Sequence, residues 1–207
     1  MKTSTKGNTK EHLLDVAERH FADFGYAGTT LRGIIKEAKV NVAAVAYHYG
    51  SKEELFNAVI QRFAVPVVAQ QLELLTEVVR QDDIPLRSVL VAFYTPPLKL
   101  LKSRGAHGER LALLLGRAQT EPEPIFSLVD RHYALCRSQF IDALRKSTPN
   151  ISEAEQNWNF EFMLSLIVCF FTRQKFIRKR YGDTDDWTAE QALERMVSFC
   201  ESGMDRS

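Results

Sequence analysis

The stretch TTLRGIIKEAKVNVAAVAYHYGSKEEL, residues 29–55, contains two short helical patterns separated by a tight turn. Thr30 can cap a first helix that ends at Ala38, because its hydroxyl can accept a hydrogen bond from a free amide of the first turn. Asn41 can cap a second helix, which extends to Tyr49, in the same way. Two short helices joined by so brief a connection predict a helix-turn-helix.

A longer helix is predicted ahead of this pair. Leu13, Ala17 and Phe21 recur at helical spacing, so that they share one face. Gly25 is expected to end this helix with a positive φ angle, which glycine adopts at little cost. The face formed by these apolar residues can support the helix-turn-helix from behind.

The sequence after residue 50 predicts a larger bundle of helices. Pro66 is expected to kink or break the first of them, and Pro96-Pro97 to interrupt a later one. A single helix is expected over Pro124–Lys146. The predicted fold is therefore all-α with about nine helices. We expect a helix-turn-helix domain over residues 1–50, and a larger helical domain over residues 51–207.

The composition limits the possible classes of protein. The 207 residues carry a formal net charge of +1, so any nucleic-acid site must be a local surface. The three cysteines are widely spaced and odd in number, which favours free thiols in a reducing compartment. The most apolar stretch, Phe162–Phe171, is too short to span a bilayer, and the polar N-terminus does not resemble a secretory signal. We expect a cytoplasmic protein.

The sequence does not favour an enzyme. It lacks a glycine-rich phosphate loop and a paired cysteine motif, and its histidines do not have the spacing of metal ligands. These histidines are His12, His20, His48, His107 and His132. We therefore predict no enzymatic activity, no metal and no cofactor.

Helical geometry divides residues 42–49 into two faces. Val45 and Tyr49 are four residues apart and can join the core, which leaves the opposite flank for DNA. Alanines on that flank allow close entry into the major groove, and a tyrosine hydroxyl can reach a phosphate. From spacing alone, simple exposure or packing of these side chains remains an alternative. The candidate DNA contacts are Thr30, Arg32, Val42, Ala43, Ala44, Tyr47, His48 and Lys52.

The same stretch resembles the DNA-binding unit of TetR-family transcriptional regulators, and the resemblance extends from about Thr9 to Phe63. The shared features are the threonine-capped helix, the Tyr-His-Tyr cluster and the following Ser-Lys-Glu. Lys39 replaces the turn glycine that is usual in the family, so we expect strain if this position needs a positive φ. Ala46 replaces a tyrosine that many members carry, which puts one phosphate contact in doubt.

The resemblance implies a homodimer that binds a palindromic operator through the DNA-binding domain of residues 1–50, with ligand binding and dimerisation in residues 51–207. Such a protein is most often a repressor, which a small effector releases from DNA. The chain is similar, more distantly, to members of the family that sense fatty acids or acyl-thioesters, so an apolar effector is expected. The alternative is a constitutive or architectural DNA-binding protein without an effector. Pro96-Pro97 and Gly116 can leave a cavity by disturbing the helix packing. The candidate pocket residues, each of which could instead be ordinary core, are Phe93, Leu114, Arg117, Phe140, Met163 and Ile167.

The predicted helix from Ser152 to Arg180 supports a dimer independently of the resemblance. Between Phe160 and Phe176 it is apolar on nearly all sides, so it needs partners on more than one face. A second subunit could cover one side, whereas a central helix buried within a monomer is the alternative. The candidate interface residues are Phe171, Lys175, Leu193, Met196, Val197 and Cys200.

Overall fold

The computed structural model describes residues 4–103, 106–181 and 188–204, and within these ranges the chain forms ten α-helices and no strand. The helices are α1 (Ser4–Gly28), α2 (Leu31–Ala38), α3 (Val42–His48), α4 (Lys52–Val79), α5 (Leu86–Ser103), α6 (Ala106–Ala118), α7 (Ile125–Asp130), α8 (Ala134–Ser147), α9 (Glu153–Tyr181) and α10 (Ala189–Met204). The all-α prediction is confirmed, with one helix more than we expected.

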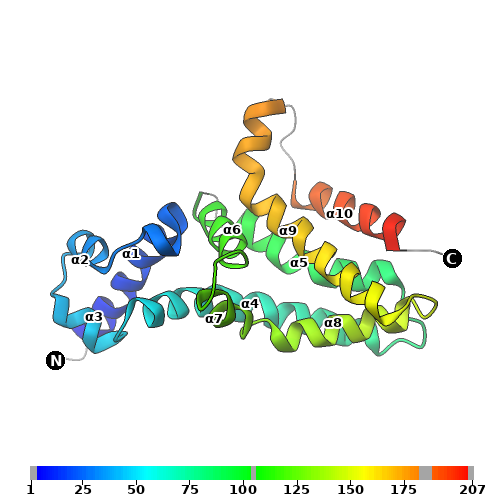
Figure 1. Cartoon of the computed structure of the whole chain (residues 1–207), viewed down its shortest axis with the longest axis horizontal. Coiled ribbons are helices and arrows are strands. Elements are labelled where there is room, and N and C mark those ends of the chain that lie inside the picture. The colour runs from blue at the N-terminus through cyan, green and yellow to red at the C-terminus, as the bar shows by residue number, and fades with distance from the viewer. Residues whose placement is uncertain (1–3, 104–105, 182–187, 205–207) are drawn as a thin grey trace.

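The helices form a small N-terminal unit and a larger bundle (Figure 1). Helices α1, α2 and α3 lie together at one end, and α4 leads from them into the bundle. Within the bundle α10 packs on α5, and α9 packs on α6 and α8. The bundle therefore has helices on several sides of α5, while one long connecting helix carries the N-terminal unit.

The end of α1 follows the prediction for Gly25. This residue has φ +71° and ψ 177°, which is non-helical, although the assigned helix continues to Gly28. An ordinary side chain rarely adopts such a φ, so glycine suits this break. The first part of α1 thus ends at residue 24, and the chain turns toward α2.

The predicted break at Pro66 and the predicted interruption at Pro96-Pro97 are both wrong, because the helices continue through these prolines. Helix α4 continues past Pro66, which is exposed, so water can solvate the carbonyl that loses its donor. Helix α5 continues through Pro96 and Pro97. Since Pro97 has no N–H, the Phe93 carbonyl lacks its helical partner, and Gln71 Nε2 of α4 donates to it at 2.7 Å. A tertiary contact thus replaces the missing helical hydrogen bond.

The helix expected over residues 124–146 is instead two helices, α7 and α8. The chain turns at residues 131–133, where the amides of His132 and Tyr133 donate to carbonyls three residues earlier. The His132 ring lies 2.8 Å from Asn57 Oδ1 of α4, and Tyr133 packs against the apolar core. These contacts with other helices favour the turn over a continuous helix.

The buried apolar residues form two clusters that share helices α4 and α6. The first cluster joins α1, α2 and α3 to the first half of α4 and to parts of α6 and α7. The second lies within the bundle and includes the last part of α4. Consequently α4 and α6 each contact both regions, and a shift of either helix affects both. The expected domain boundary at residues 50 and 51 stays a prediction.

Candidate nucleic-acid interface and effector cavity

The turn between α2 and α3 is set by side-chain caps and by one residue with a positive φ. Thr30 Oγ1 accepts from the Gly33 amide at 3.1 Å, and Asn41 Oδ1 accepts from the Ala43 amide at 3.1 Å. Lys39 ends α2 with φ +53° and ψ 37°, the left-handed conformation that glycine would adopt most easily. Position 39 therefore has a positive φ, the condition under which we expected strain from a lysine in place of glycine.

Helix α3 has one buried face and one exposed face. Val45 is buried against the core of the N-terminal unit, and the predicted burial of this residue is confirmed. Tyr49 is half-buried, its hydroxyl donates to the Lys10 carbonyl at 3.1 Å, and burial raises its pKa to about 12. On the other face Val42 and Tyr47 are exposed, Tyr47 to 72%. Large exposed apolar side chains on a short helix are suited to contact a partner.

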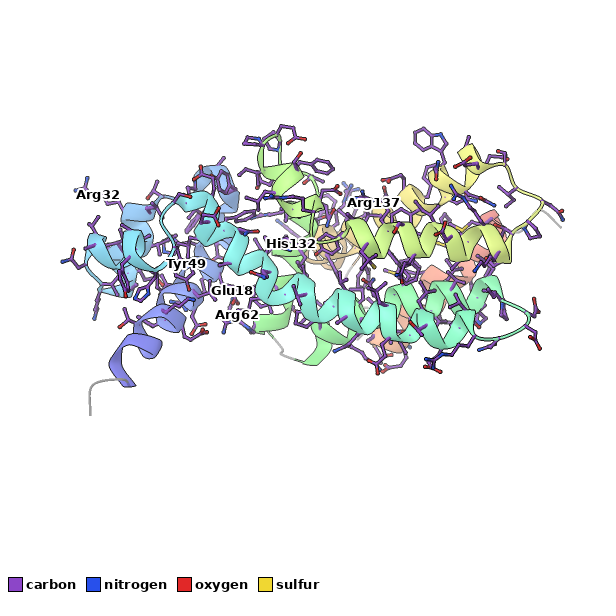
Figure 2. The ribbon with its side chains drawn as sticks, turned by 90° about the horizontal axis from the view of Figure 1, so that it is seen from below. Glu18, Arg32, Tyr49, Arg62, His132 and Arg137 are labelled. Carbon is purple, nitrogen blue, oxygen red and sulfur yellow. The ribbon has the colours of Figure 1, made fainter. Side chains whose placement is uncertain are left out.

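The other candidate DNA contacts lie near this face. Arg32 projects from the outer end of the N-terminal unit, away from the bundle (Figure 2). Thr30 is exposed at the start of α2, whereas the half-exposed His48 ring lies 5.0 Å from the Tyr47 ring. Lys52 Nζ lies over the Tyr26 ring at 4.2 Å from its centroid. Ala43 is exposed, and the side chain of Ala44 is outside the described residues.

Hydrogen-bonded carboxylates hold α2 and the start of α4 on α1. Glu37 accepts from Arg19 at 2.8 Å and lies 2.8 Å from His20 Nε2, and the hydrogen bond from Arg19 is the main reason that its pKa is lowered. Tyr26 donates its hydroxyl to Glu53 at 2.7 Å, which lowers the pKa of Glu53. These contacts fix the orientation of α2 and of the start of α4 relative to α1.

Charged residues also meet where the N-terminal unit joins the bundle. Arg62 of α4 pairs with Asp15 at 2.6 Å and approaches the buried Glu18 at 3.6 Å. Figure 2 shows Arg62 and Glu18 close to each other at this junction. His107 Nδ1 of α6 lies 3.1 Å from Glu18 Oε1. Helices α1, α4 and α6 therefore share one polar cluster.

An apolar cavity lies between α4, α5, α6, α8 and α9, with about 60 Å³ open to water-sized molecules. This is space for a few water molecules. Its lining is Val67, Gln71, Phe93, Pro97, Leu115, Gly116, Gln119, Tyr133, Cys136, Arg137, Phe160, Leu164, Ile167, Val168 and Phe171. Both Pro97 and Gly116 take part, in agreement with the expectation that irregular residues border the space.

The predicted pocket residues divide into three groups. Phe93 and Ile167 line the cavity. Phe140 and Met163 are buried in the same core cluster but do not border the space. Leu114 belongs instead to the cluster shared with the N-terminal unit.

Arg117 also lies elsewhere. Its Nη1 donates to the Ala22 and Asp23 carbonyls of α1, at 2.8 and 3.2 Å, so it does not pair with Glu121 or point into the cavity. The charged residue at the cavity is Arg137, which is ion-paired with Asp130 and also borders an outer groove beside Gln119. Sequence reasoning missed Arg137 because nothing in its spacing distinguishes it from a solvated arginine.

Most of the candidate interface residues are buried within the chain. Phe171, Met196, Val197 and Cys200 are at most 7% exposed, because α10 packs on α5 and Phe171 borders the cavity. Leu193 is half-buried against the same core, and the side chain of Lys175 is outside the described residues. The large exposed apolar residues on α9 and α10 are Trp158, Phe162, Phe176 and Phe199.

Trp158 and Phe162 stack on each other with ring centroids 5.9 Å apart. The residues of α10 that the sequence suggested for an interface are mostly buried within the chain, because the buried residues have the clearer apolar periodicity. An exposed phenylalanine such as Phe199 stands outside that pattern.

In the described ranges, His, Cys, Asp and Glu residues do not gather in groups of three or more that could hold a metal ion. Within the same part of the chain, none of the helices combines the length and apolar character needed to cross a membrane.

Several solved structures share this fold. AibR, in complex with isovaleryl coenzyme A and operator DNA, has a TM-score of 0.66 at 17% identity, and the match covers 92% of this chain and 97% of AibR. The ketosteroid transcriptional regulator KstR2 of Mycobacterium tuberculosis has a TM-score of 0.65 at 16% identity, over 100% and 98% of the two chains. At these identities the likeness shows the fold alone.

Curated relatives share parts of the sequence. The HTH-type transcriptional dual regulator CecR of Shigella flexneri is 29% identical over 126 residues, which are 58% of this chain and 55% of CecR. The HTH-type transcriptional repressor AcnR of Corynebacterium efficiens is 35% identical over 57 residues, or 28% and 30% of the two chains. The matches thus span between about a third and about half of these relatives. They are regulators of transcription rather than enzymes.

Two family patterns match separate parts of the chain. Residues 13–59, which include the helix-turn-helix, match "Bacterial regulatory proteins, tetR family". Residues 91–203, more than half of the chain, match "Tetracyclin repressor-like, C-terminal domain". The chain therefore belongs to the TetR family of transcriptional regulators, as the helix-turn-helix and the all-α bundle had indicated.

Proposed function

We propose that this protein is a transcriptional repressor that binds a palindromic operator as a homodimer and is released by a small apolar effector. The observation that carries the proposal is the division of α3 into a buried face at Val45 and an exposed face at Val42, Ala43 and Tyr47. A recognition helix needs both faces, since one fixes it to the protein and the other meets base edges.

The DNA contacts fall into two kinds. We assign Val42, Ala43, Ala44 and Tyr47 to the major groove, where small side chains allow close approach and an aromatic ring meets bases. The exposed Thr30 at the start of α2 is suited to a phosphate, as are Arg32, His48 and Lys52. Lys52 would leave the Tyr26 ring to do so, and a cation–π contact at an exposed site is worth only about 0.5–1 kcal/mol.

The homodimer is proposed from the unpaired apolar faces of α9 and α10. Trp158 and Phe162 of α9 are exposed, although neighbouring residues of the same helix pack on α6 and α8. Phe199 of α10 is exposed to 72%. A second copy that covers these residues gives a closed twofold assembly, which is the symmetry of a palindromic operator.

We propose that the apolar part of the effector occupies the apolar cavity. The polar residues of the lining include Gln119, Gln71, whose Nε2 already donates to the Phe93 carbonyl, and Arg137 at the edge, which is paired with Asp130. We expect any charged group of an acyl carboxylate or thioester to stay near Arg137. The cavity must enlarge to admit an acyl chain, so the effector favours a wider bundle and releases DNA by its preference for that state.

The DNA contact can be tested with a duplex selected by the purified protein from a random library. Tyr47→Ala and Lys52→Ala should each weaken binding, and the loss of a phosphate contact should flatten the salt dependence by roughly one counterion. Leu135→Ser is the matched control, because Leu135 is an exposed apolar residue of α8 in the bundle. If both variants bind as well as the parent, α3 is not the recognition helix.

The dimer can be tested by sedimentation at micromolar concentration. Phe162→Glu and Phe199→Glu should each produce monomers, because they place a charge in the proposed interface. Leu135→Glu should stay dimeric. A parent protein that sediments as a monomer would contradict the assembly.

A constitutive DNA-binding protein without an effector is the alternative, and the small size of the cavity favours it. Thermal denaturation with alcohols, carboxylates and thioesters of increasing chain length separates the two. An effector that enters the cavity should raise the melting temperature and reduce duplex binding at the same concentrations. Stabilisation by none of these compounds supports the constitutive role.

A further inference from the structure

The break in α1 frees backbone groups that the helix would otherwise pair. In a regular helix the Ala22 carbonyl would accept from the Tyr26 amide, and the Asp23 carbonyl from the next amide. Gly25 has non-helical angles, so the last turn of α1 does not form these hydrogen bonds in the regular way. Free backbone groups at a helix end require other partners.

Helix α6 and the turn after it supply those partners. Arg117 Nη1 donates to the Ala22 carbonyl at 2.8 Å and to the Asp23 carbonyl at 3.2 Å. Glu121 Oε1 accepts from the Tyr26 amide at 3.1 Å. A cation and a carboxylate, four residues apart, thus bind the freed carbonyls and the freed amide at the end of α1. We call Arg117 and Glu121 the α6 clamp.

The residues beside the clamp line the effector cavity. Leu115, Gly116 and Gln119 border it, and they lie within four residues of Arg117. At Gly116 α6 is seated tightly on α9, because an added Cβ would lie 2.8 Å from Thr172 Cγ2 and 3.3 Å from the Val168 carbonyl oxygen. The α6–α9 contact therefore leaves little room for a wider cavity unless one helix moves.

The end of α1 leads directly to the proposed DNA-binding surface. The buried Thr29 donates its hydroxyl to the His20 and Gly25 carbonyls, at 2.9 and 2.7 Å. The next residue, Thr30, is the N-cap of α2. A displacement at residues 22–26 is thus passed through a fixed connection to the start of α2.

We propose that Arg117 and Glu121 are positioning residues that couple the cavity to the helix-turn-helix. When an occupant displaces α6, the clamp moves the end of α1 and with it the N-terminus of α2, so the two recognition helices leave their operator spacing. This proposal rests on the proposed function, which assigns DNA to α2 and α3 and an effector to the cavity.

The test uses substitutions that displace α6 without a ligand. Gly116→Ala forces α6 away from α9. If this variant does not fold, Leu164→Phe takes its place, because the larger side chain fills the cavity from the opposite wall. Each is placed in the parent and in an Arg117→Met/Glu121→Met background, where the side chains stay unbranched but cannot make the hydrogen bonds. Glu121→Gln is the conservative control, because its amide oxygen can still accept from Tyr26.

The first measurement is hydrogen exchange of the full-length protein over residues 22–31, which needs no DNA. The Tyr26 amide should exchange about tenfold faster in the Met/Met variant and at the parent rate in Glu121→Gln. Gly116→Ala should speed exchange in this segment in the parent background and add less than about twofold in the Met/Met background. An equal effect in both backgrounds overturns the proposal, since the displacement would then bypass the clamp.

The second measurement is affinity for the selected duplex. Gly116→Ala should weaken binding about tenfold in the parent background, within the usual range of allosteric coupling, and about twofold or less in the Met/Met background. Equal losses in both backgrounds overturn the coupling role. If the parent selects no duplex, the proposed function fails, and the hydrogen exchange still decides whether the clamp transmits movement of α6.

Discussion

The N-terminal unit and the bundle differ in what determines their local structure. In the unit, each short helix begins at a capping residue that is visible in the sequence, such as Thr30 or Asn41, and each cap forms. In the bundle, the Phe93 carbonyl of α5 receives its hydrogen bond from Gln71, 22 residues earlier in the chain. The starts of α2 and α3 are thus set by neighbours in sequence, whereas this point of α5 is set by a neighbour in space.

This difference bears on the two proposed functions. A surface that must fit DNA benefits from locally fixed helices, because local caps hold α2 and α3 whatever the bundle does. A cavity that must change size benefits from contacts between helices that can separate. The shared helices α4 and α6 connect the two kinds of structure.

The largest expected effect concerns the core at which α4 enters the N-terminal unit. Phe56 is fully buried, and its ring centroid lies 4.9 Å from that of Phe21 and 5.1 Å from that of Tyr26. Phe56→Ala should reduce the free energy of unfolding by about 3–5 kcal/mol. Urea unfolding followed by circular dichroism measures this loss. A loss below about 1 kcal/mol would mean that local caps alone hold the unit.

The next effect tests whether the bundle depends on a contact between helices. Gln71→Leu removes the donor to the Phe93 carbonyl, and a buried acceptor left unsatisfied should cost about 1–3 kcal/mol of unfolding free energy. Pro97→Ala restores a backbone N–H within α5, so Gln71→Leu should cost much less in that background. Urea unfolding of the four proteins forms a double-mutant cycle. If the two costs add, the orphaned carbonyl is not the reason for Gln71.

Particular residues explain how far the sequence predicts this structure. Gly25 was expected to have a positive φ and does, and Lys39, which replaces the glycine usual in the family, also has one, because turn chemistry acts over a few residues. Pro66 was expected to kink or break its helix and Pro96-Pro97 to interrupt theirs, yet α4 and α5 both continue, and at Pro97 another helix supplies the missing hydrogen bond. The same limit applies to the sites. The exposed face of α3 follows from helical geometry, whereas Arg137 at the cavity depends on how α8 packs.

A smaller effect tests the strain at the turn of the helix-turn-helix. Lys39→Gly should raise the free energy of unfolding by about 1 kcal/mol, because glycine adopts φ +53° without a steric penalty. Gly50→Ala is the matched control with the opposite sign. Gly50 has φ +76° and open space around it, so an added methyl group changes only the backbone strain. Equal signs for the two variants would show that packing, rather than φ, controls this region.

The smallest expected effect is the pH dependence of the contact between α1 and α2. The pKa of Glu37 is lowered from 4.5, mainly by the hydrogen bond from Arg19 and then by that from His20. The unfolded chain thus binds a proton at higher pH than the folded protein does. The contribution of Glu37 is fully present above pH 4.5 and is lost as the pH falls through the lower, folded value.

Glu37→Gln should abolish this part of the pH dependence while leaving the exposed face of α3 unchanged. Hydrogen exchange of α2 amides between pH 3 and pH 6, corrected for the intrinsic rates, measures the effect. Because Glu37 is exposed, the effect should shrink as salt is added. A pH dependence that survives in Glu37→Gln would assign it to another carboxylate at the junction, of which Asp15 beside Arg62 has the shortest ion pair. In that case α2 would respond to pH through α4 rather than through its own contact with α1, and the N-terminal unit would be less independent of the bundle than its local caps indicate.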